Sequence, residues 1–393
     1  MTNNQSKIEK LIAELCPKGV ELKSIGEICQ INRGRVMSKD YLKDNAGEYP
    51  VYSSQTADNG IFGRINTYDY DGEYLTWTTD GAYAGSIFYR SGKFSITNVC
   101  GLLKAKSDDV NMKFLSYILS TVSKKYVSAG MGNPKIMSNV MEKIKIPLPP
   151  LAIQEEIVKI LNSFTELESE LESELESRKK QYKYYMNNFY NIKNVEYKPL
   201  GEVGTFIRGK RFVRSDIVKE GVPCIHYGEL YTHYNVWTKE SKSFLKPDLA
   251  ARLRMAHYGD VIIVAAGETI EDIGNGVAWL GKLNVVIHDA CFAFSHNLNP
   301  KYVSYFLQTD NFRSQIKSFI SSGKISAINA KSLEKAVIPI PTIEEQEKIV
   351  SILDNFDALI SDISIGLPAE LSARRSQYEY YRGKLLTFNE YAK

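Results

Sequence analysis

Two copies of one segment decide the organisation of this chain: IPLPPLAIQEEIVKILNSF at 146–164 and IPIPTIEEQEKIVSILDNF at 338–356. The copies align at an offset of 192 residues, so that Gln154 matches Gln346 and Phe164 matches Phe356. Farther along, QYKYY at 181–185 matches QYEYY at 377–381 at an offset of 196, so the second copy holds four extra residues. A repeat on this scale indicates a duplicated architecture.

The repeated segments are typical of long helices, each about 40 residues or roughly 60 Å long. Prolines precede the apolar pattern, where a helix tolerates them. Apolar residues then follow the 4–3 spacing of a coiled-coil seam. In the second copy Gly366 and Pro368 predict a kink or break. The residues expected to form the seam and its partner contacts are Ile157, Leu161, Phe164, Leu171, Leu175, Tyr182, Ile349, Leu353, Phe356, Ile360, Ile363 and Tyr378.

A tandem tetrapeptide lies inside the first repeated segment. The sequence ELES occurs three times in succession at 166–177, so that a leucine recurs every four residues. A solvated acidic helix with an apolar stripe accounts for part of this pattern. Gain or loss of one unit would change the helix length by about 6 Å without breaking the helix. The array therefore has the form of an adjustable spacer.

Two unlike blocks precede the two helices. VELKSIGE at 20–27 resembles VEYKPLGE at 195–202, and an Arg-Gly pair follows each of them, at 33–34 and 208–209. The blocks end alike, in NMKFLSY at 111–117 and NPKYVSY at 299–305, and share little in between. Short alternating runs with frequent glycine predict strands and turns inside both blocks. We expect five parts: an N-terminal helix at 1–19, blocks at 20–146 and 195–338, and helices at 147–194 and 339–393.

Composition and charge exclude several classes of protein. The five cysteines lie far apart without a CxxC pair, which argues against a zinc finger and a disulfide framework and fits the reducing cytoplasm. There is no run of 18 apolar residues and no signal peptide, so neither membrane spanning nor secretion is expected. The net charge of +3 divides into +4, −2, +4 and −3 over residues 1–146, 147–195, 196–337 and 338–393. The two basic parts permit a polyanionic partner.

Catalytic motifs are missing from the sequence. The Gly-Lys pairs are followed by Phe94, Arg211, Leu283, Ile325 or Leu385 and never by Ser or Thr, which excludes a Walker A loop. We find no (Asn/Asp)-Pro-Pro-aromatic motif, no glycine loop for a methyl-donor cofactor and no metal-ligand spacing among the five histidines. The sequence therefore predicts no catalytic residue and no metal site, and the chain is not expected to be an enzyme.

The blocks instead hold polar, aromatic and basic residues suited to DNA. Asn, Gln, Ser, Thr and Arg side chains on loops can read base edges, and Arg and Lys can contact phosphate. A hydrogen-bonded surface turn is the alternative for each residue, and only the recurrence in both blocks favours DNA. The candidates in the first block are Arg33, Arg35, Tyr52, Ser53, Ser54, Gln55, Asn59, Trp77, Thr78, Thr79, Asp80, Tyr83, Lys93, Asn98, Asn133 and Lys135. Those in the second block are Arg208, Lys210, Arg211, Arg214, His226, Tyr227, Glu229, Tyr231, Glu268, Thr269, Ser322 and Lys324.

Taken together, these features resemble the specificity (S, HsdS) subunit of Type I restriction–modification systems. The resemblance covers essentially the whole chain. It is carried by IPLPP…QEEI at 146–157, IPIP…EQEKI at 338–349, VELKSIGE at 20–27 and YEYYRGKLLTF at 378–388.

The resemblance implies an α/β (α+β) fold with a pseudo-two-fold repeat: two target recognition domains with mixed β-sheets, joined by two long antiparallel helices that form a coiled coil. Each domain would read one half of a split, asymmetric DNA site, and the helices would set the distance between the halves. The implied partners are double-stranded DNA, two modification subunits that bind S-adenosylmethionine and methylate adenine, and two motor-nuclease subunits that use ATP and Mg²⁺. This chain would bind none of these cofactors. The N-terminal helix, about residues 5–15, would pack beside the C-terminal one.

Two alternatives stay open at this point. The first is the recognition subunit of a Type IIB- or IIG-like restriction enzyme, which would have a single fused nuclease–methylase as its partner. The second is a coiled-coil scaffold without a DNA role, in which substitution of Gln55, Trp77 or Arg208 would leave DNA selectivity unchanged.

Overall fold

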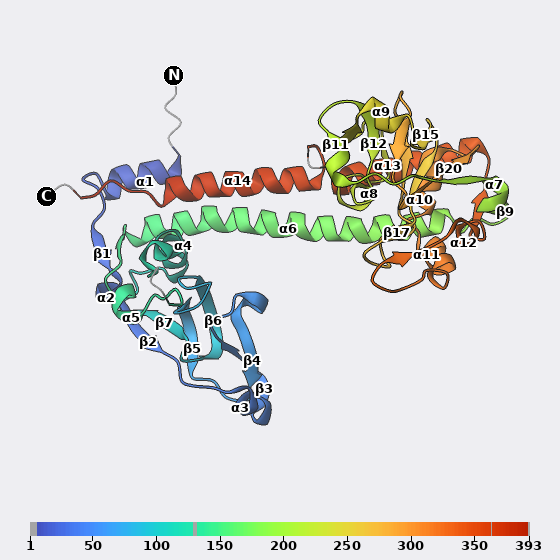
Figure 1. Ribbon diagram of the computed structural model, residues 1–393. Coiled ribbons are helices and arrows are strands. Elements are labelled where there is room, and N and C mark those ends of the chain that lie inside the picture. Colours follow the sequence, from blue (N-terminus) through green and yellow to red (C-terminus); the bar gives the residue numbers. More distant parts are fainter. Residues whose placement is uncertain (1–5, 129–131, 363, 392–393) are drawn as a thin grey trace, which may run out of the picture. The chain divides into compact units, whose positions relative to one another are not determined.

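The computed structural model describes residues 6–128, 132–362 and 364–391 (Figure 1). The chain forms two compact units. The first unit comprises the residues up to 170 together with those from 371 on, and the second comprises 171–370. None of the helices in the described ranges combines the length and the apolar content that crossing a lipid bilayer requires.

A six-stranded mixed sheet forms the centre of the first unit, in the order β2-β7-β5-β6-β3-β4. All neighbouring strands pair antiparallel except β3 and β6: β3 runs parallel to the last residues of β6. A separate antiparallel pair, β1–β8, joins the two ends of the block. The strands are β1 (Leu22–Ser24), β2 (Cys29–Arg33), β3 (Ala46–Tyr52), β4 (Ile61–Ile65), β5 (Tyr70–Thr78), β6 (Ile87–Ile96), β7 (Cys100–Ala105) and β8 (Lys145–Pro147).

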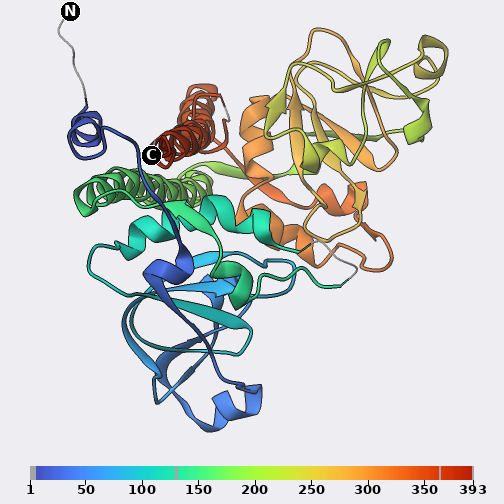
Figure 2. The same ribbon diagram turned by 90° about the vertical axis from the view of Figure 1, so that its left-hand side faces the viewer.

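The period-two alternation of the strands separates two apolar clusters in this unit. Leu75, Trp77 and Leu103 belong to the main cluster, whereas Tyr74 and Leu102 belong to a smaller cluster on the opposite face. Helix α4 covers the main cluster and lies between the sheet and α6 (Leu151–Phe189) in both views (Figures 1 and 2). The helices before α6 are α1 (Lys7–Leu15), α2 (Ile25–Ile28), α3 (Lys39–Asp44), η1 (Ala57–Gly60), α4 (Met112–Val122), η2 (Ser123–Tyr126) and α5 (Ser138–Met141).

Two five-stranded sheets form the second unit, in the orders β10-β20-β16-β18-β13 and β11-β14-β12-β19-β15. The pairs β9–β22 and β17–β21 complete it. The strands are β9 (Glu196–Pro199), β10 (Gly204–Arg208), β11 (Ile217–Val218), β12 (Val222–Ile225), β13 (Trp237–Thr238), β14 (Ser243–Leu245), β15 (Met255–Ala256), β16 (Val261–Val264), β17 (Ala266–Gly267), β18 (Gly276–Trp279), β19 (Val285–Ile287), β20 (Cys291–His296), β21 (Ser326–Ala327) and β22 (Val337–Ile340).

A large apolar core fills the second unit. The run Val261–Val264 of β16 is buried on both faces, as its continuous apolar sequence predicts. Helix α10 packs on β18, and Ser304 of α10 donates to the carbonyl oxygens of Val236 and Gly276 at 2.6 and 2.8 Å. The shorter helices are α7 (Leu200–Val203), η3 (Arg214–Asp216), α8 (Glu229–Thr232), α9 (Pro247–Ala250), α10 (Pro300–Phe306), α11 (Asp310–Lys317) and α12 (Ala330–Leu333).

The repeated segments form the long helices. Helix α6 (Leu151–Phe189) is continuous over 39 residues, or about 58 Å. The second copy is divided into α13 (Ile343–Ser361) and α14 (Leu367–Leu385). This division confirms the break expected at Gly366 and Pro368, because proline stands in the first turn of α14, where its missing N–H is tolerated.

The two copies pack against one another within each unit, as the seam predicts. In the first unit Phe164 of α6 contacts the rings of Tyr378 and Tyr381 of α14, with ring centroids 6.5 and 5.5 Å apart. One turn farther along α6, Glu168 accepts a hydrogen bond of 2.6 Å from Arg375, which fixes the antiparallel direction. Figure 1 shows α14 beside the first half of α6.

In the second unit, the rings of Tyr182 and Tyr185 of α6 lie 6.3 and 5.5 Å from that of Phe356 of α13. Among the other seam residues, five are buried: Ile157, Leu161, Ile349, Leu353 and Ile360. Leu171 and Leu175 are half-buried. Ile363 lies outside the described residues.

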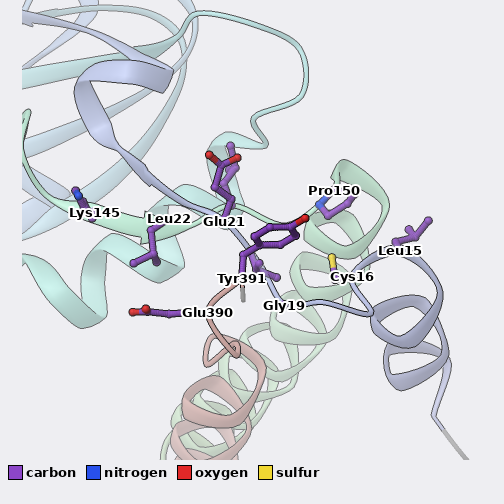
Figure 3. Close-up of a pocket in the computed structure, with 11 residues that line it drawn as sticks. Leu15, Cys16, Gly19, Glu21, Leu22, Lys145, Pro150, Glu390 and Tyr391 are labelled. Atoms are coloured by element: carbon purple, nitrogen blue, oxygen red, sulfur yellow. The ribbon is translucent and has the colours of Figure 1, made fainter. Parts of the chain in front are cut away.

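The segment that follows α1 lies beside the last described residues of the chain in the first unit. The N–H of Val20 donates to the carbonyl of Asn389 at 2.9 Å, and the N–H of Tyr391 donates to the carbonyl of Val20 at 3.2 Å. Figure 3 shows Glu390 and Tyr391 beside this segment, around a pocket of about 810 Å³. Helix α1 belongs here too, because Ile8 and Leu386 share one buried cluster. In the second unit the equivalent link is covalent, because β9 begins at Glu196, shortly after α6 ends at Phe189.

The two units share one underlying frame. Strands β2-β7-β5 of the first unit correspond to β10-β20-β16 of the second in order and direction. The parallel contact of β3 with β6 corresponds to that of β12 with β19. The pairs β1–β8 and β9–β22 and the helices α4 and α10 correspond as well. The duplication therefore extends into the blocks, where the sequences look unrelated.

Candidate nucleic-acid interface

An arginine–glycine pair closes one end of the sheet in the first unit. Arg33 is the last residue of β2, and Gly34 follows it. A Cβ atom on Gly34 would lie 2.1 Å from the carbonyl oxygen of Ile96, so only glycine fits against the end of β6. The Arg33 guanidinium then reaches the carbonyl oxygen of Asn98, at 2.6 Å from Nη2 and 3.2 Å from Nε.

The second unit repeats this arrangement. Arg208 ends β10, and a Cβ atom on Gly209 would lie 2.1 Å from the carbonyl oxygen of His288. The Nε of Arg208 donates to the carbonyl oxygen of Asp289 at 2.8 Å. Arg33 and Arg208 therefore occupy equivalent positions and bind equivalent carbonyl groups.

Both contacted residues belong to a turn that ends in cysteine: TNVC at 97–100 and HDAC at 288–291. The N–H of Cys100 donates to the carbonyl of Thr97 at 3.0 Å, and that of Cys291 donates to the carbonyl of His288 at 2.9 Å. Burial raises the pKa of Cys100 to about 12, so its thiol stays protonated and serves packing. We call each Arg-Gly pair together with its turn a strand-end site.

A second pair of side chains lies at each strand-end site, where the two parallel strands finish. In the first unit Ser53 follows β3 and Thr97 follows β6, and the Thr97 hydroxyl donates to Oγ of Ser53 at 2.9 Å. In the second unit His226 follows β12 and His288 follows β19, with ring centroids 4.7 Å apart. The register of the parallel pairs makes Ser53 equivalent to His226 and Thr97 equivalent to His288.

The histidine pair stands in a cleft of about 740 Å³ in the second unit. Aromatic rings surround it: that of Phe212 lies 5.0 Å from His288, and that of Tyr227 lies 4.6 Å from His226. The cleft brings together seven of the residues that the sequence singled out: Arg208, Arg211, Arg214, His226, Tyr227, Glu268 and Lys324. Four of these seven are cationic, which suits the cleft to a polyanion.

The electrostatics of the cleft hold its histidines neutral. Burial, followed by the neighbouring His288, lowers the pKa of His226 below its ordinary value. Burial also lowers the pKa of His288, against the attraction of Asp289. The Nδ1 of His226 accepts from the N–H of Gly228 at 3.4 Å, so the ring proton is on Nε2. His226 therefore lines the cleft with a neutral ring whose Nε2–H is a donor.

The structure buries Trp77, Thr78 and Thr79, three of the residues that the sequence predicts to contact DNA. All three are at most 1% exposed, because this end of β5 is covered on both faces. The indole Nε1 of Trp77 donates to the carbonyl of Ile136 at 3.0 Å, so the side chain belongs to the core. An aromatic residue among threonines has the same sequence pattern in a core strand as in a binding strand.

Other candidates of the first block lie around the strand-end site. Ser54 and Gln55 continue the loop after Ser53, and Asn98 is exposed beside Arg33. Asp80 forms an isolated bridge with Lys135, which places the loop containing Asn133 next to the end of β5. The side chains of Asn59, Tyr83, Asn133 and Lys135 are exposed.

The remaining candidates have protein partners. Arg35 pairs with Asp69 at 3.2 Å, Lys93 lies 4.7 Å above the ring of Tyr68, and Tyr52 stacks under Arg90 at 3.6 Å. In the second block Lys210 donates to the carbonyl of Arg252 at 2.9 Å.

The carboxylate of Glu229 is engaged inside the fold. It accepts from the main-chain N–H of His226 at 2.9 Å and from the hydroxyl of Ser243 at 2.5 Å. Tyr231 is half-buried, and Thr269 and Ser322 are exposed.

Sequence reasoning missed Thr97, Phe212, His288 and Asp289. The signal that could have found them is the pairing of TNVC with HDAC, since each follows an apolar run and ends in cysteine. Across the residues that the structure describes, no group of three or more His, Cys, Asp or Glu side chains is placed to hold a metal ion.

Comparison with known proteins gives the family. The sequence model of the "Type I restriction modification DNA specificity domain" matches twice, at residues 17–177 and 192–373. A putative type I specificity subunit of Mycoplasma pneumoniae is 33% identical over 372 residues, covering 93% of this chain and 97% of the relative. A second one from the same organism is 34% identical over 345 residues, covering 83% and 97%.

Solved structures share the fold. The S subunit of a Type I system from M. genitalium superposes with a TM-score of 0.55 at 16% identity, covering 93% of this chain and 96% of that one. The HsdS subunit of Thermoanaerobacter tengcongensis gives 0.53 at 17% identity, covering 98% of both chains. The double match, the relatives of similar length and the repeated frame lead to one conclusion: the chain belongs to the family of Type I restriction–modification specificity subunits.

Proposed function

We propose that this chain recognises a split, asymmetric DNA site, with one half read by the domain at 20–146 and the other by the domain at 195–338. The observation that carries the proposal is the pair of strand-end sites. Corresponding strands form an equivalent site in each unit, yet the side chains at the centre of the two sites differ. One frame with two different surfaces suits two half-sites of unlike sequence on one DNA molecule.

The repeated helices suit two copies of one partner. Because the α6 and α13–α14 segments are alike in sequence, a partner that binds one can bind the other. We infer that two DNA-methyltransferase subunits dock on these helices and that two motor-nuclease subunits can join them. S-adenosylmethionine, ATP and Mg²⁺ then belong to the partners, and this chain contributes recognition and no catalytic step.

Selection from a random duplex library tests the proposal. The purified complex of this chain with its modification subunit is incubated with the library, and the bound duplexes are sequenced. Enrichment of two fixed half-sequences separated by an unspecified spacer is the expected result. Enrichment of one continuous motif, or no enrichment from a stable complex, contradicts it.

A control separates the two half-sites. Replacing residues 20–146 with the corresponding block of another family member changes one half-sequence and leaves the other as it was. If both halves change together, the two domains do not read independently.

A further inference from the structure

The strand-end sites contain one part that repeats and one part that differs. We propose that Arg33 and Arg208 contact backbone phosphate at equivalent places, whereas the pairs Ser53–Thr97 and His226–His288 determine which base each domain accepts. This inference rests on the proposed function and deepens it, because it separates the residues that position the DNA from those that specify its sequence.

The repeated part fits what two half-sites have in common. Two unlike half-sites of one duplex share only the sugar–phosphate backbone, and phosphate contacts carry no sequence information. Arg33 and Arg208 keep the same strand position, the same close-packed glycine and the same carbonyl contact, although the surrounding blocks differ. Because both arginines occur in unlike surroundings, we assign them to contacts with the sugar–phosphate backbone that the two half-sites share.

The charge state of the two arginines supports an anion as their ligand. Within the part of the chain that the structure describes, neither guanidinium forms an ion pair with a carboxylate, whereas Arg35 and Arg178 do so with Asp69 and Glu174. The bonds to Asn98 and Asp289 fix the orientation of Arg33 and Arg208 without neutralising their charge. A guanidinium fixed in this way can donate its remaining N–H groups to phosphate oxygens.

The differing part lies at the ends of the parallel strands. Ser53 and His226 are half-buried, whereas Thr97 and His288 are only 3% and 9% exposed. Thr97 and His288 therefore act as positioning residues: the hydroxyl of Thr97 orients Ser53, and the ring of His288 packs against His226. A hydroxyl pair and an imidazole pair differ in both size and hydrogen-bonding capacity. Residues at equivalent positions must differ in this way if the two domains are to select different bases.

The tautomer of His226 restricts the base that it can read. Its Nδ1 is occupied by the N–H of Gly228, so Nε2–H remains as the donor. Major-groove acceptors are N7 of purines, O6 of guanine and O4 of thymine, whereas cytosine offers an amino donor. We therefore expect His226 to contact an acceptor at one position of its half-site.

The test uses the complex of the full chain with its modification subunits and the duplex that the wild-type complex selects. Affinities of Arg33→Gln and Arg208→Gln are measured from 50 to 200 mM salt on cognate duplexes and on duplexes changed at one base pair. Each variant should weaken binding by a similar factor on all duplexes and lower the salt slope by about 1. Lys10→Gln on α1 serves as the matched control for loss of one charge.

The second arm changes His226 to Ala and to Gln. Discrimination at one position of the half-site read by the second domain should fall by about 5- to 150-fold, with preferences in the other half-site unchanged. Ser53→Ala should act in the same way on the other half-site alone. Unchanged preferences at the other positions of the same half-site report that the domain carrying each substitution is folded.

The outcomes separate the inference from the proposed function. If the wild-type complex selects no DNA sequence, the proposed function fails. If it selects a split site, but Arg33→Gln alters base preference, or the His226 variants weaken all duplexes equally without altering preference, the inference is overturned while the proposed function stands.

Discussion

The side-chain carbonyl oxygen of Gln154 accepts a hydrogen bond of 2.9 Å from the main-chain N–H of Asn111. Gln346 makes the same bond to Asn299, also at 2.9 Å. Both glutamines are at most 1% exposed, and each joins the first turn of a long helix to the N-cap residue of the helix that covers its domain. The matching glutamines of the sequence repeat therefore serve to attach each recognition domain to its helix.

Replacement of Gln154 by leucine should destabilise the first unit. Its amide also donates to the carbonyls of Asp109 and Pro149, at 2.9 and 2.7 Å, so leucine leaves three main-chain groups without their partner. We expect a loss of about 2–4 kcal/mol in the free energy of unfolding, measured by urea denaturation. Gln30→Leu, at an exposed position on β2, should change it by no more than about 0.5 kcal/mol, and equal effects at the two positions would refute this role.

Replacement of Trp77 by phenylalanine should affect stability and leave base preference unchanged. The ring is fully buried against Gly101, where a Cβ atom would lie 2.3 Å from the indole. Phenylalanine leaves a cavity and an unpaired carbonyl at Ile136, for a loss of about 2 kcal/mol in the free energy of unfolding. Denaturation and duplex selection on the same variant measure both properties, and an altered half-site would restore Trp77 as a DNA contact.

The second unit should lose stability in mild acid through His296. Burial lowers the pKa of this side chain to about 4, whereas the unfolded chain has an ordinary histidine pKa of about 6.5. Only the unfolded state binds the proton between these values. The contribution of His296 is therefore fully present above pH 6.5 and declines, by up to about 3 kcal/mol, as the pH falls to 4.

Unfolding of His296→Asn across the same pH range isolates this contribution. Asparagine keeps an acceptor for the N–H of Leu298, 3.2 Å from the ring in the wild type, but cannot titrate. Its stability curve should be flatter than that of the wild type between pH 4 and 6.5. Parallel curves would show that His296 does not titrate as its burial requires.

Deletion of one ELES unit should shorten the DNA spacer and preserve both half-sites. Removing residues 170–173 shortens α6 by about 6 Å, which corresponds to about 2 base pairs of duplex. Sequencing of selected duplexes measures the spacer, with Ser173→Ala as the control that keeps the helix length. An unchanged spacer would rule out α6 as the element that sets the distance.

The sequence predicted the repeated frame well because its features are periodic. The seam at Phe164, the break between Ser361 and Leu367, and the matching block ends follow from spacing and from proline chemistry. The centre of each strand-end site could not be predicted, since the equivalence of Ser53 with His226 depends on which strands pair in parallel. Local patterns carry no information about such long-range pairing, and they also left buried Trp77 indistinguishable from a surface aromatic residue.

Base-resolution mapping of adenine methylation shows whether two different domains recognise the two halves of one DNA site. The chain is co-expressed with its modification subunit, and the methylated positions of a plasmid are read. We expect a split, asymmetric motif with one modified adenine in each half and a spacer of fixed length. A continuous motif, or an unmethylated plasmid despite a stable complex, would contradict recognition by two different domains on one helical frame.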